Sequence, residues 1–163
     1  TNEGIHSNWV EITAKGFTGW TFAGYLHVKK NASLPLNKTE VLFPLPANSF
    51  IKQRKYGKYL YNKRNFFYPG VRFQMQKKAF VQAMYSGKVI VKSLDGTGKI
   101  WLVLQHQGGL VSYYYGLDSS SLYLGESVGK GGKLGVVAKR GFLEIQIREG
   151  FAKKHYDPEM FFP

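Results

Sequence analysis

The sequence predicts an all-β protein. Short runs alternate between apolar and polar residues and are bounded by Gly, Asn, Asp or Ser. Aromatic residues, which favour strands, are abundant, since 11 Tyr and 12 Phe accompany 19 Gly in 163 residues. No long amphipathic helix is visible. The best short helical candidate runs from Lys52 to Asn62, and Gly57 weakens it.

Four runs carry the strand prediction. WVEIT at 9–13, GKVIVKS at 87–93 and FLEIQIRE at 142–149 alternate with period two. IWLVLQHQ at 100–107 is nearly continuous apolar before it turns polar, which is typical of a strand buried on both faces. LDGTGK at 94–99 joins two of these runs and contains Asp-Gly, a strong hairpin signal.

Composition limits the possible functions. The chain has no cysteine, which excludes disulfides, thiolate catalysis and cysteine-ligated metals. A net charge of +13 favours anionic partners such as nucleic acid, acidic lipid or an anionic cell-wall polymer. No apolar run is long enough to span a membrane. The chain begins at Thr1 without a visible signal sequence, so we expect its targeting signal to have been removed.

The chain divides into two parts around a polar connection. KKNASLPLNKTE at 29–40 combines Pro, Asn, Ser and Lys with little periodicity. We therefore assign 1–30 to an N-terminal segment, 31–40 to a linker and 41–163 to a larger domain. The N-terminal segment is too short to bury a core alone.

The N-terminal segment resembles the second half of a bacterial SH3-like domain. The resemblance rests on WVEI at 9–12, GFTGW at 16–20 and Tyr25-Leu26. It implies a partial small barrel that is completed upstream or by packing on the larger domain. An unrelated β-hairpin with two tryptophans is the alternative.

The larger domain resembles the lysostaphin/LytM-type zinc endopeptidases, which cut peptide cross-links in peptidoglycan. AFVQAMYSGKV at 79–89 is similar to a hairpin of that family, and LVSYYYGLDS at 110–119 to one of its strands. YLGESVGKGGKLGVV at 123–137 and GFLEIQIREGFAKKHYDPEMFF at 141–162 follow in the family's order. The resemblance implies an antiparallel β-sheet with an open groove.

The zinc chemistry of that family needs residues that this chain lacks. Its H-x-G-x-D motif corresponds to YPGVR at 68–72, so Tyr68 and Arg72 stand where two zinc ligands would. Phe142 replaces the third ligand. Gly116 and Arg140 replace the two histidines that assist proton transfer. Arginine stays protonated, phenylalanine has no donor atom, and a phenol is a poor lone ligand.

Period-two geometry supports this register. Leu143, Ile145 and Ile147 would share one face of a strand, and the other face would carry Phe142 with Glu144, Gln146 and Arg148. A register offset by two would place Glu144 at the ligand position, but it misaligns the Glu-Ile and Asp-Pro matches.

Other catalytic arrangements are weaker. The four histidines, His6, His27, His106 and His155, do not make the family's pairing, and no H-E-x-x-H motif exists. We expect no metal and no cofactor, and hence a pseudo-enzyme. An active zinc endopeptidase is the less favoured alternative.

The resemblance implies a cell-envelope protein, periplasmic or secreted, that binds peptidoglycan or regulates a cell-wall amidase or endopeptidase. Arginines and aromatic residues of the altered groove could clamp a stem-peptide carboxylate. The candidates are Tyr68, Arg72, Tyr114, Arg140, Phe142 and Glu144. A separate basic, aromatic run, IKQRKYGKYLYNKRNFFY at 51–68, leaves open a module that binds single-stranded nucleic acid or another anionic polymer.

Overall fold

The computed structural model describes residues 9–14, 17–22, 41–150 and 154–162, with side chains placed from residue 41 onward. The chain forms two compact units, Thr1–Ser33 and Leu34–Pro163. In the first unit, strands β1 (Trp9–Ala14) and β2 (Phe17–Phe22) form an antiparallel hairpin, which confirms the strand predicted at 9–13. The SH3-like resemblance stays a prediction, and the predicted linker at 31–40 lies outside the described residues.

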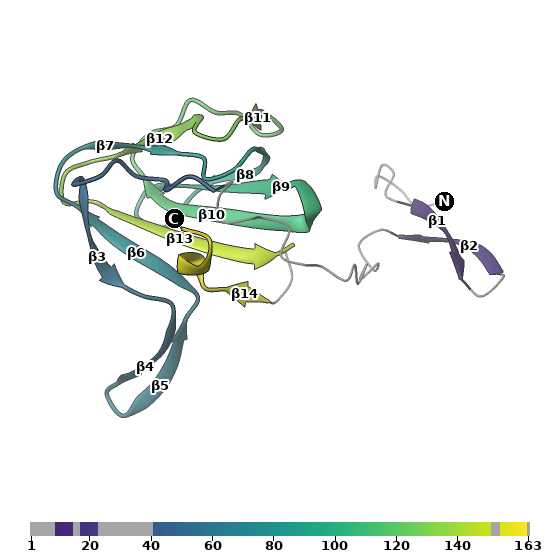
Figure 1. Ribbon diagram of the computed structural model, residues 1–163, viewed down its shortest axis with the longest axis horizontal. Coiled ribbons are helices and arrows are strands. Elements are labelled where there is room, and N and C mark those ends of the chain that lie inside the picture. The colour runs from purple at the N-terminus through teal and green to yellow at the C-terminus, as the bar shows by residue number, and fades with distance from the viewer. Residues whose placement is uncertain (1–8, 15–16, 23–40, 151–153, 163) are drawn as a thin grey trace. The chain divides into compact units, whose positions relative to one another are not determined.

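The second unit is built on an eight-stranded antiparallel sheet in the order β11-β8-β9-β10-β13-β6-β3, with β14 paired to β13 (Figure 1). The all-β prediction is therefore confirmed. The strands of this sheet are β3 (Phe50–Arg54), β6 (Gly70–Met75), β8 (Gly87–Leu94), β9 (Ile100–His106), β10 (Leu110–Leu117), β11 (Ser127–Val128), β13 (Phe142–Glu149) and β14 (His155–Tyr156).

Two smaller antiparallel pairs complete the unit. They are β7 (Ala79–Gln82) with β12 (Lys133–Val137), and β4 (Gly57–Tyr61) with β5 (Arg64–Tyr68). Short 3₁₀ turns lie at Gln107–Gly109 and Pro158–Met160. Among the described residues, no helix is long and apolar enough to cross a membrane.

The strands predicted at 87–93, 100–107 and 142–149 correspond to β8, β9 and β13. The turn between β8 and β9 is closed by Asp95, whose Oδ1 accepts hydrogen bonds from the amides of Thr97 and Lys99. These contacts hold the pKa of Asp95 below its usual value, the side-chain bond from Thr97 contributing most. The hairpin predicted at 94–99 is therefore confirmed.

Residues 52–62, the weak helical candidate, span the end of β3 and strand β4, which pair with β6 and β5. One local prediction is wrong, because residues 79–89 do not form a hairpin. Strand β7 pairs with β12 and strand β8 pairs with β9, so the two segments turn away from one another.

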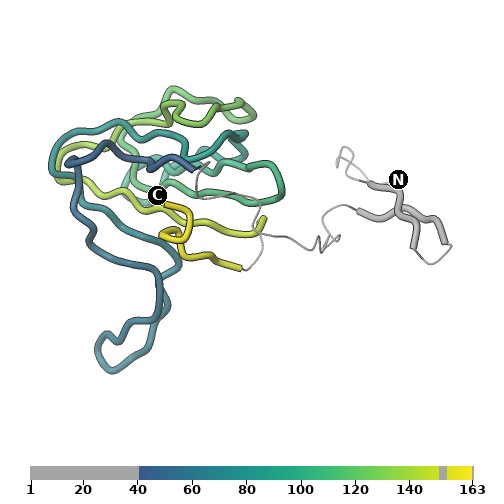
Figure 2. Tube along the Cα trace, viewed as in Figure 1, coloured from purple at the N-terminus to yellow at the C-terminus, as the bar shows by residue number. Residues whose placement is uncertain are grey.

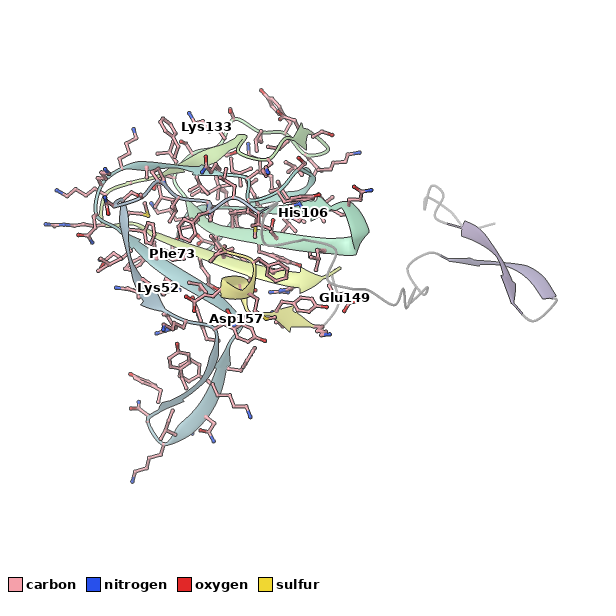
Figure 3. All side chains as sticks on the ribbon, viewed as in Figure 1. Lys52, Phe73, His106, Lys133, Glu149 and Asp157 are labelled. Atoms are coloured by element: carbon pink, nitrogen blue, oxygen red, sulfur yellow. The ribbon has the colours of Figure 1, made fainter. Side chains whose placement is uncertain are left out.

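The main core lies between one face of the large sheet and the pair β7–β12 (Figure 3). Leu102 and Leu104 of β9, Ile145 of β13 and Val81 of β7 are fully buried there. Figure 2 shows the first described residues of the second unit, from Val41, beside the described C-terminal residues. Their aromatic side chains form one cluster, in which Phe43 and Phe162 have ring centroids 4.9 Å apart and Phe43 and Phe50 5.2 Å apart.

The opposite face of the large sheet is only partly covered. Val103, Val111 and Tyr113 form a second, small buried cluster there. Since Leu102 and Leu104 point to the main core, β9 is buried on both faces, as its continuous apolar run predicted. This second face leaves room for a site beside the small cluster.

Candidate functional site

A hollow of about 540 Å³ opens on the face of β13 that points away from the main core. Period two directs Phe142 and Glu144 into this hollow, while Leu143 and Ile145 are buried in the core. The hollow is lined by Arg72, Asp95, Thr97, Lys99, Tyr115, Gly116, Ala138, Lys139, Arg140, Gly141, Phe142 and Glu144.

Its floor is the pairing of β6 with β13. Arg72 lies opposite Glu144, and Gly70 lies opposite Gln146. A Cβ atom at residue 70 would stand 2.4 Å from the carbonyl oxygen of Ile145, so only glycine allows the strands to approach this closely. The glycine of YPGVR thus sets the close approach of the strands that present Arg72 and Glu144.

Three donors converge on the carboxylate of Glu144. The Tyr68 hydroxyl and Arg72 Nη2 both donate to Oε2, the latter at 3.2 Å. Gln146 Nε2 donates to Oε1 at 2.7 Å, and Arg148 donates in turn to Gln146 Oε1. Both oxygens of Glu144 are therefore engaged within the protein, as a half-buried charge requires.

Tyr68 is neutral beside this carboxylate and lies close to two arginine side chains. Burial, followed by the hydrogen bond to Glu144, raises the pKa of Tyr68 well above that of an ordinary phenol. The Arg72 guanidinium lies over the Phe142 ring at 5.6 Å, and the Arg54 guanidinium lies over the Tyr68 ring at 4.9 Å. Tyr68 consequently acts as a neutral donor between two cations.

The rim of the hollow carries positive charge that the protein does not neutralise. Lys139 and Arg140 are exposed and form no ion pair with any described residue. Lys99, by contrast, pairs with Asp118. Arg72 Nε is buried and has no hydrogen-bond partner among the described residues. An anion that entered the hollow would meet the exposed Lys139 and Arg140 first.

Most of the residues predicted from the sequence lie together. Tyr68, Arg72, Phe142 and Glu144 contact one another as described above, and Gly116 and Arg140 line the same hollow.

Tyr114 does not belong to the hollow, which corrects its assignment as a groove candidate. Its side chain is fully buried in the main core, its hydroxyl accepts a hydrogen bond from the Met84 amide at 3.2 Å, and burial raises its pKa to about 12. Its neighbour Tyr115 lines the hollow instead and stacks between Trp101 and Tyr113. Alternation along YYY at 113–115 could have indicated this, since Tyr113 and Tyr115 share one face.

The backbone at Gly116 admits no side chain. Its φ is +99°, and the register of β10 against β9 shifts between Tyr115 and Leu117. A Cβ atom here would stand 2.1 Å from the carbonyl oxygen of Phe142. A histidine at this position would therefore require a different path of the strand.

Comparison with known proteins identifies the family. The sequence profile of peptidase family M23 matches residues 66–158, more than half of the chain. The chain belongs to peptidase family M23. No curated protein matches the sequence.

Solved structures share this M23 fold at low identity. A chain of the SpoIIIAH–SpoIIQ complex aligns with a TM-score of 0.63 and 19% identity, over 75% of this chain and 99% of that one. The catalytic domain of lysostaphin from Staphylococcus simulans gives 0.57 and 24%, over 70% and 92%. A zinc-containing peptidase from Vibrio cholerae gives 0.61 and 21%, over 75% and 38%. They support the antiparallel lysostaphin-like architecture.

The residues of this M23 domain do not fit the zinc that active relatives use. A zinc site needs neutral imidazole, thiolate or carboxylate donors with one open position. Here the two residues of YPGVR that face Glu144 are a phenol with a raised pKa and a guanidinium, and Phe142 offers no donor. Within the described part of the chain, no three His, Cys, Asp or Glu residues are grouped to hold a metal ion.

Proposed function

We propose that this M23 domain is a non-catalytic binding module of the bacterial cell envelope, and that its hollow takes a carboxylate of a peptidoglycan stem peptide without a metal. One observation carries the proposal. Tyr68 and Arg72, which stand at the two ligand positions of the H-x-G-x-D motif, both donate to Glu144. The polar groups of the site thus recognise a carboxylate, where an active relative would hold a cation.

The shape and charge of the hollow support binding of an anionic peptide. Its volume of about 540 Å³ lies in the range of small-ligand sites. The exposed cations Lys139 and Arg140 stand at its rim, and Phe142, 40% exposed, offers an apolar surface beside them. Guanidinium groups pair with carboxylates through two parallel hydrogen bonds, which favours Arg72 and Arg140 as the contacts.

A protein partner is the second candidate. The SpoIIIAH–SpoIIQ complex contains a chain with this fold, so the fold also occurs in a protein–protein assembly. A scaffold or regulator of a cell-wall amidase or endopeptidase would use the domain in the same way. The membership of family M23 supports a place in the cell envelope for either role.

Retention on purified sacculi tests the hollow. The variant Arg72→Gln/Arg140→Gly removes two cations, and residue 140 tolerates glycine because its φ is +66°. We expect its retention to fall about tenfold or more, since a hydrogen bond to a charged group contributes about 1.5–3 kcal/mol. Lys77→Gln/Lys130→Gln removes the same charge outside the hollow and should bind like the parent.

The pattern of retention decides among the proposals. Parental retention in the hollow variant would overturn the carboxylate site, and capture of a hydrolase without sacculus binding would favour the scaffold role. The absence of catalysis is tested separately, by zinc analysis of the purified protein beside a cell-wall digestion assay. Stoichiometric zinc together with release of cross-link fragments would refute the non-catalytic assignment.

A further inference from the structure

The hairpin of β4 and β5 projects from the body of the second unit (Figure 1). The two strands pair only with each other. Asn62 and Lys63 form its turn with φ of 49° and 61°, and two consecutive positive φ angles are typical of a tight two-residue hairpin turn. The hairpin is therefore a narrow arm whose outer part packs on no sheet.

The tip of this arm is apolar and exposed. Leu60 is 71% exposed and Tyr61 is 68% exposed, directly before the turn. Leu60 and Tyr61 are consecutive in sequence at the end of a projecting hairpin. Because both remain largely exposed, their apolar surface contributes little to the stability of the fold. They are available to a partner that offers an apolar phase.

The arm itself carries cations and no carboxylate, and the carboxylate that contacts its base is Glu144, bound by Tyr68. No Asp or Glu occurs between residues 41 and 94, whereas Lys55, Lys58, Lys63 and Arg64 are all exposed on or beside the hairpin. A surface of one sign attracts a partner of the opposite sign, and binding such a partner relieves the repulsion among its own like charges. The partner is therefore anionic.

Ring stacking distinguishes between anionic partners. Tyr59 stacks on Phe66 with centroids 5.5 Å apart and planes 22° apart. The Arg54 guanidinium lies over the rings of Phe66 and Tyr68, at 5.9 and 4.9 Å. Ring faces of Tyr59, Phe66 and Tyr68 are thus engaged within the protein, whereas Tyr61 at the tip is exposed and its neighbour Leu60 has no ring that could stack on a base. Soluble wall polymers, for their part, provide no apolar phase for Leu60.

We infer that the β4–β5 hairpin docks on a bilayer surface that contains anionic phospholipids. Leu60 and Tyr61 enter the boundary between headgroups and acyl chains, where tyrosine places its ring in the apolar region and its hydroxyl in the wet one. Lys58, Lys63 and Arg64 remain at the level of the lipid phosphates, with their aliphatic stems against the apolar tip.

Co-sedimentation of the full chain with vesicles tests this inference. We expect binding to phosphatidylcholine vesicles that contain phosphatidylglycerol, and little binding to pure phosphatidylcholine. Lys58→Gln/Lys63→Gln/Arg64→Gln should weaken binding on the order of a hundredfold, since each basic side chain near an anionic surface contributes about fivefold. Leu60→Ser/Tyr61→Ser should weaken it at least about tenfold.

The chain offers a matched control. Tyr123 and Leu124 are an exposed Tyr-Leu pair elsewhere on the domain, 75% and 69% exposed. Tyr123→Ser/Leu124→Ser should bind vesicles like the parent, because this pair is not on the arm. Sacculus retention should be unchanged in the tip variant, since Leu60 and Tyr61 do not line the hollow.

Several outcomes would overturn the inference. They are failure of the parent to bind anionic vesicles, equal binding to neutral vesicles, and a tip variant that binds as well as the control. Salt-sensitive binding of a single-stranded oligonucleotide that depends on Tyr61, without vesicle binding, would assign the arm to nucleic acid instead. Loss of sacculus retention in the tip variant alone would assign it to a wall polymer.

Discussion

His106 shows how one buried polar residue couples stability to pH. Its side chain lies at the end of β9 and is 5% exposed. Nδ1 is 2.9 Å from the Ser86 carbonyl oxygen, which can only accept, so Nδ1 carries the proton. Nε2, 2.7 Å from Ser112 Oγ, then accepts the hydroxyl proton in the neutral ring. Burial lowers the pKa of His106.

This residue predicts acid sensitivity. Because the pKa in the folded state is below the value of about 6.5 expected in the unfolded chain, the unfolded state binds more protons at acidic pH. The free energy of unfolding should therefore decrease as pH falls below about 6.5, with a slope that approaches 1.4 kcal/mol per pH unit at most. Urea denaturation at a series of pH values measures it.

His106→Gln is the control, since an amide can form both hydrogen bonds without titrating. The parent and the variant differ in the slope of the unfolding free energy against pH, and this difference is the contribution of His106. The remaining histidines, including His155, whose pKa is also lowered by burial, contribute equally to both proteins. Identical slopes would show that His106 does not contribute.

Single residues of the hollow could be predicted from the order of motifs, but the direction of their side chains only in part. The alternation of 142–149 placed Phe142 and Glu144 on the polar face, and the structure confirms it. Alternation places Tyr113 and Tyr115 on one face and Tyr114 on the other, but three identical residues do not show which face is buried, and Tyr114 was assigned to the wrong one. Lys139 lies in a turn, where no period applies, and was not predicted.

At the scale of elements, strands could be predicted where apolar and polar residues alternate clearly along the sequence. Strand β13 begins and ends where its alternation does, because Leu143, Ile145 and Ile147 lie on one face and, apart from Phe142, the other face is polar. The run at 52–62 gave only a weak helical candidate and no strand prediction, because its basic residues obscured the period. Its pairing with Arg64–Tyr68 follows from a turn at Asn62 and Lys63, two residues without a strong turn signature.

The adjacency of β6 and β13 predicts that a metal site can be rebuilt. Tyr68 and Arg72 reach the same oxygen of Glu144, and the Phe142 ring is 5.6 Å from the Arg72 guanidinium carbon. Tyr68→His/Arg72→Asp/Phe142→His should therefore bind about one zinc ion per chain. Elemental analysis after dialysis measures it, with Phe142→Leu in place of Phe142→His as the control that lacks the third donor.

The rebuilt site should still not cleave cross-links. Gly116 and Arg140 supply no imidazole, and the Phe142 carbonyl 2.1 Å from a Cβ at residue 116 prevents its simple restoration. Hydrolysis by the triple variant would contradict the conclusion that cleavage needs imidazoles at residues 116 and 140. Failure to bind zinc would show that the side chains at residues 68, 72 and 142 do not converge on one metal position.

At the scale of the whole molecule, the described core belongs to one unit. Within the residues whose side chains are described, the main cluster runs from Val41 to Phe162, inside the second of the two compact units. We therefore expect a fragment of residues 34–163 to unfold in urea with the free energy of the full chain, within about 0.5 kcal/mol.

A fragment of residues 50–163 is the informative comparison. It lacks Val41, Phe43 and Leu45, and should lose about 3 kcal/mol or more, given the apolar surface they bury. Loss of folding in the longer fragment would show that the N-terminal unit is required.

The order of strands was beyond prediction from the residues alone. Strand β13 lies between β10 and β6, which precede it by about 30 and 70 residues, and nothing local specifies such pairings. The resemblance to a known family supplied the architecture, because the spacing of its motifs already contains those pairings. The projecting arm lies mostly outside the matched residues 66–158, and the resemblance could not predict it.

The internal partners of Glu144 have a kinetic consequence. A ligand carboxylate gains only the difference between its own contacts and those that Glu144 already makes with Tyr68, Arg72 and Gln146. If the hollow binds a stem-peptide carboxylate as proposed, exchange of one carboxylate for another at Arg72 has a small net free energy, and the rim cation Arg140, which pairs with no described carboxylate, supplies most of the loss expected in the double variant. Because affinity differences between related complexes arise mostly in the dissociation rate, we expect fast release of such a peptide.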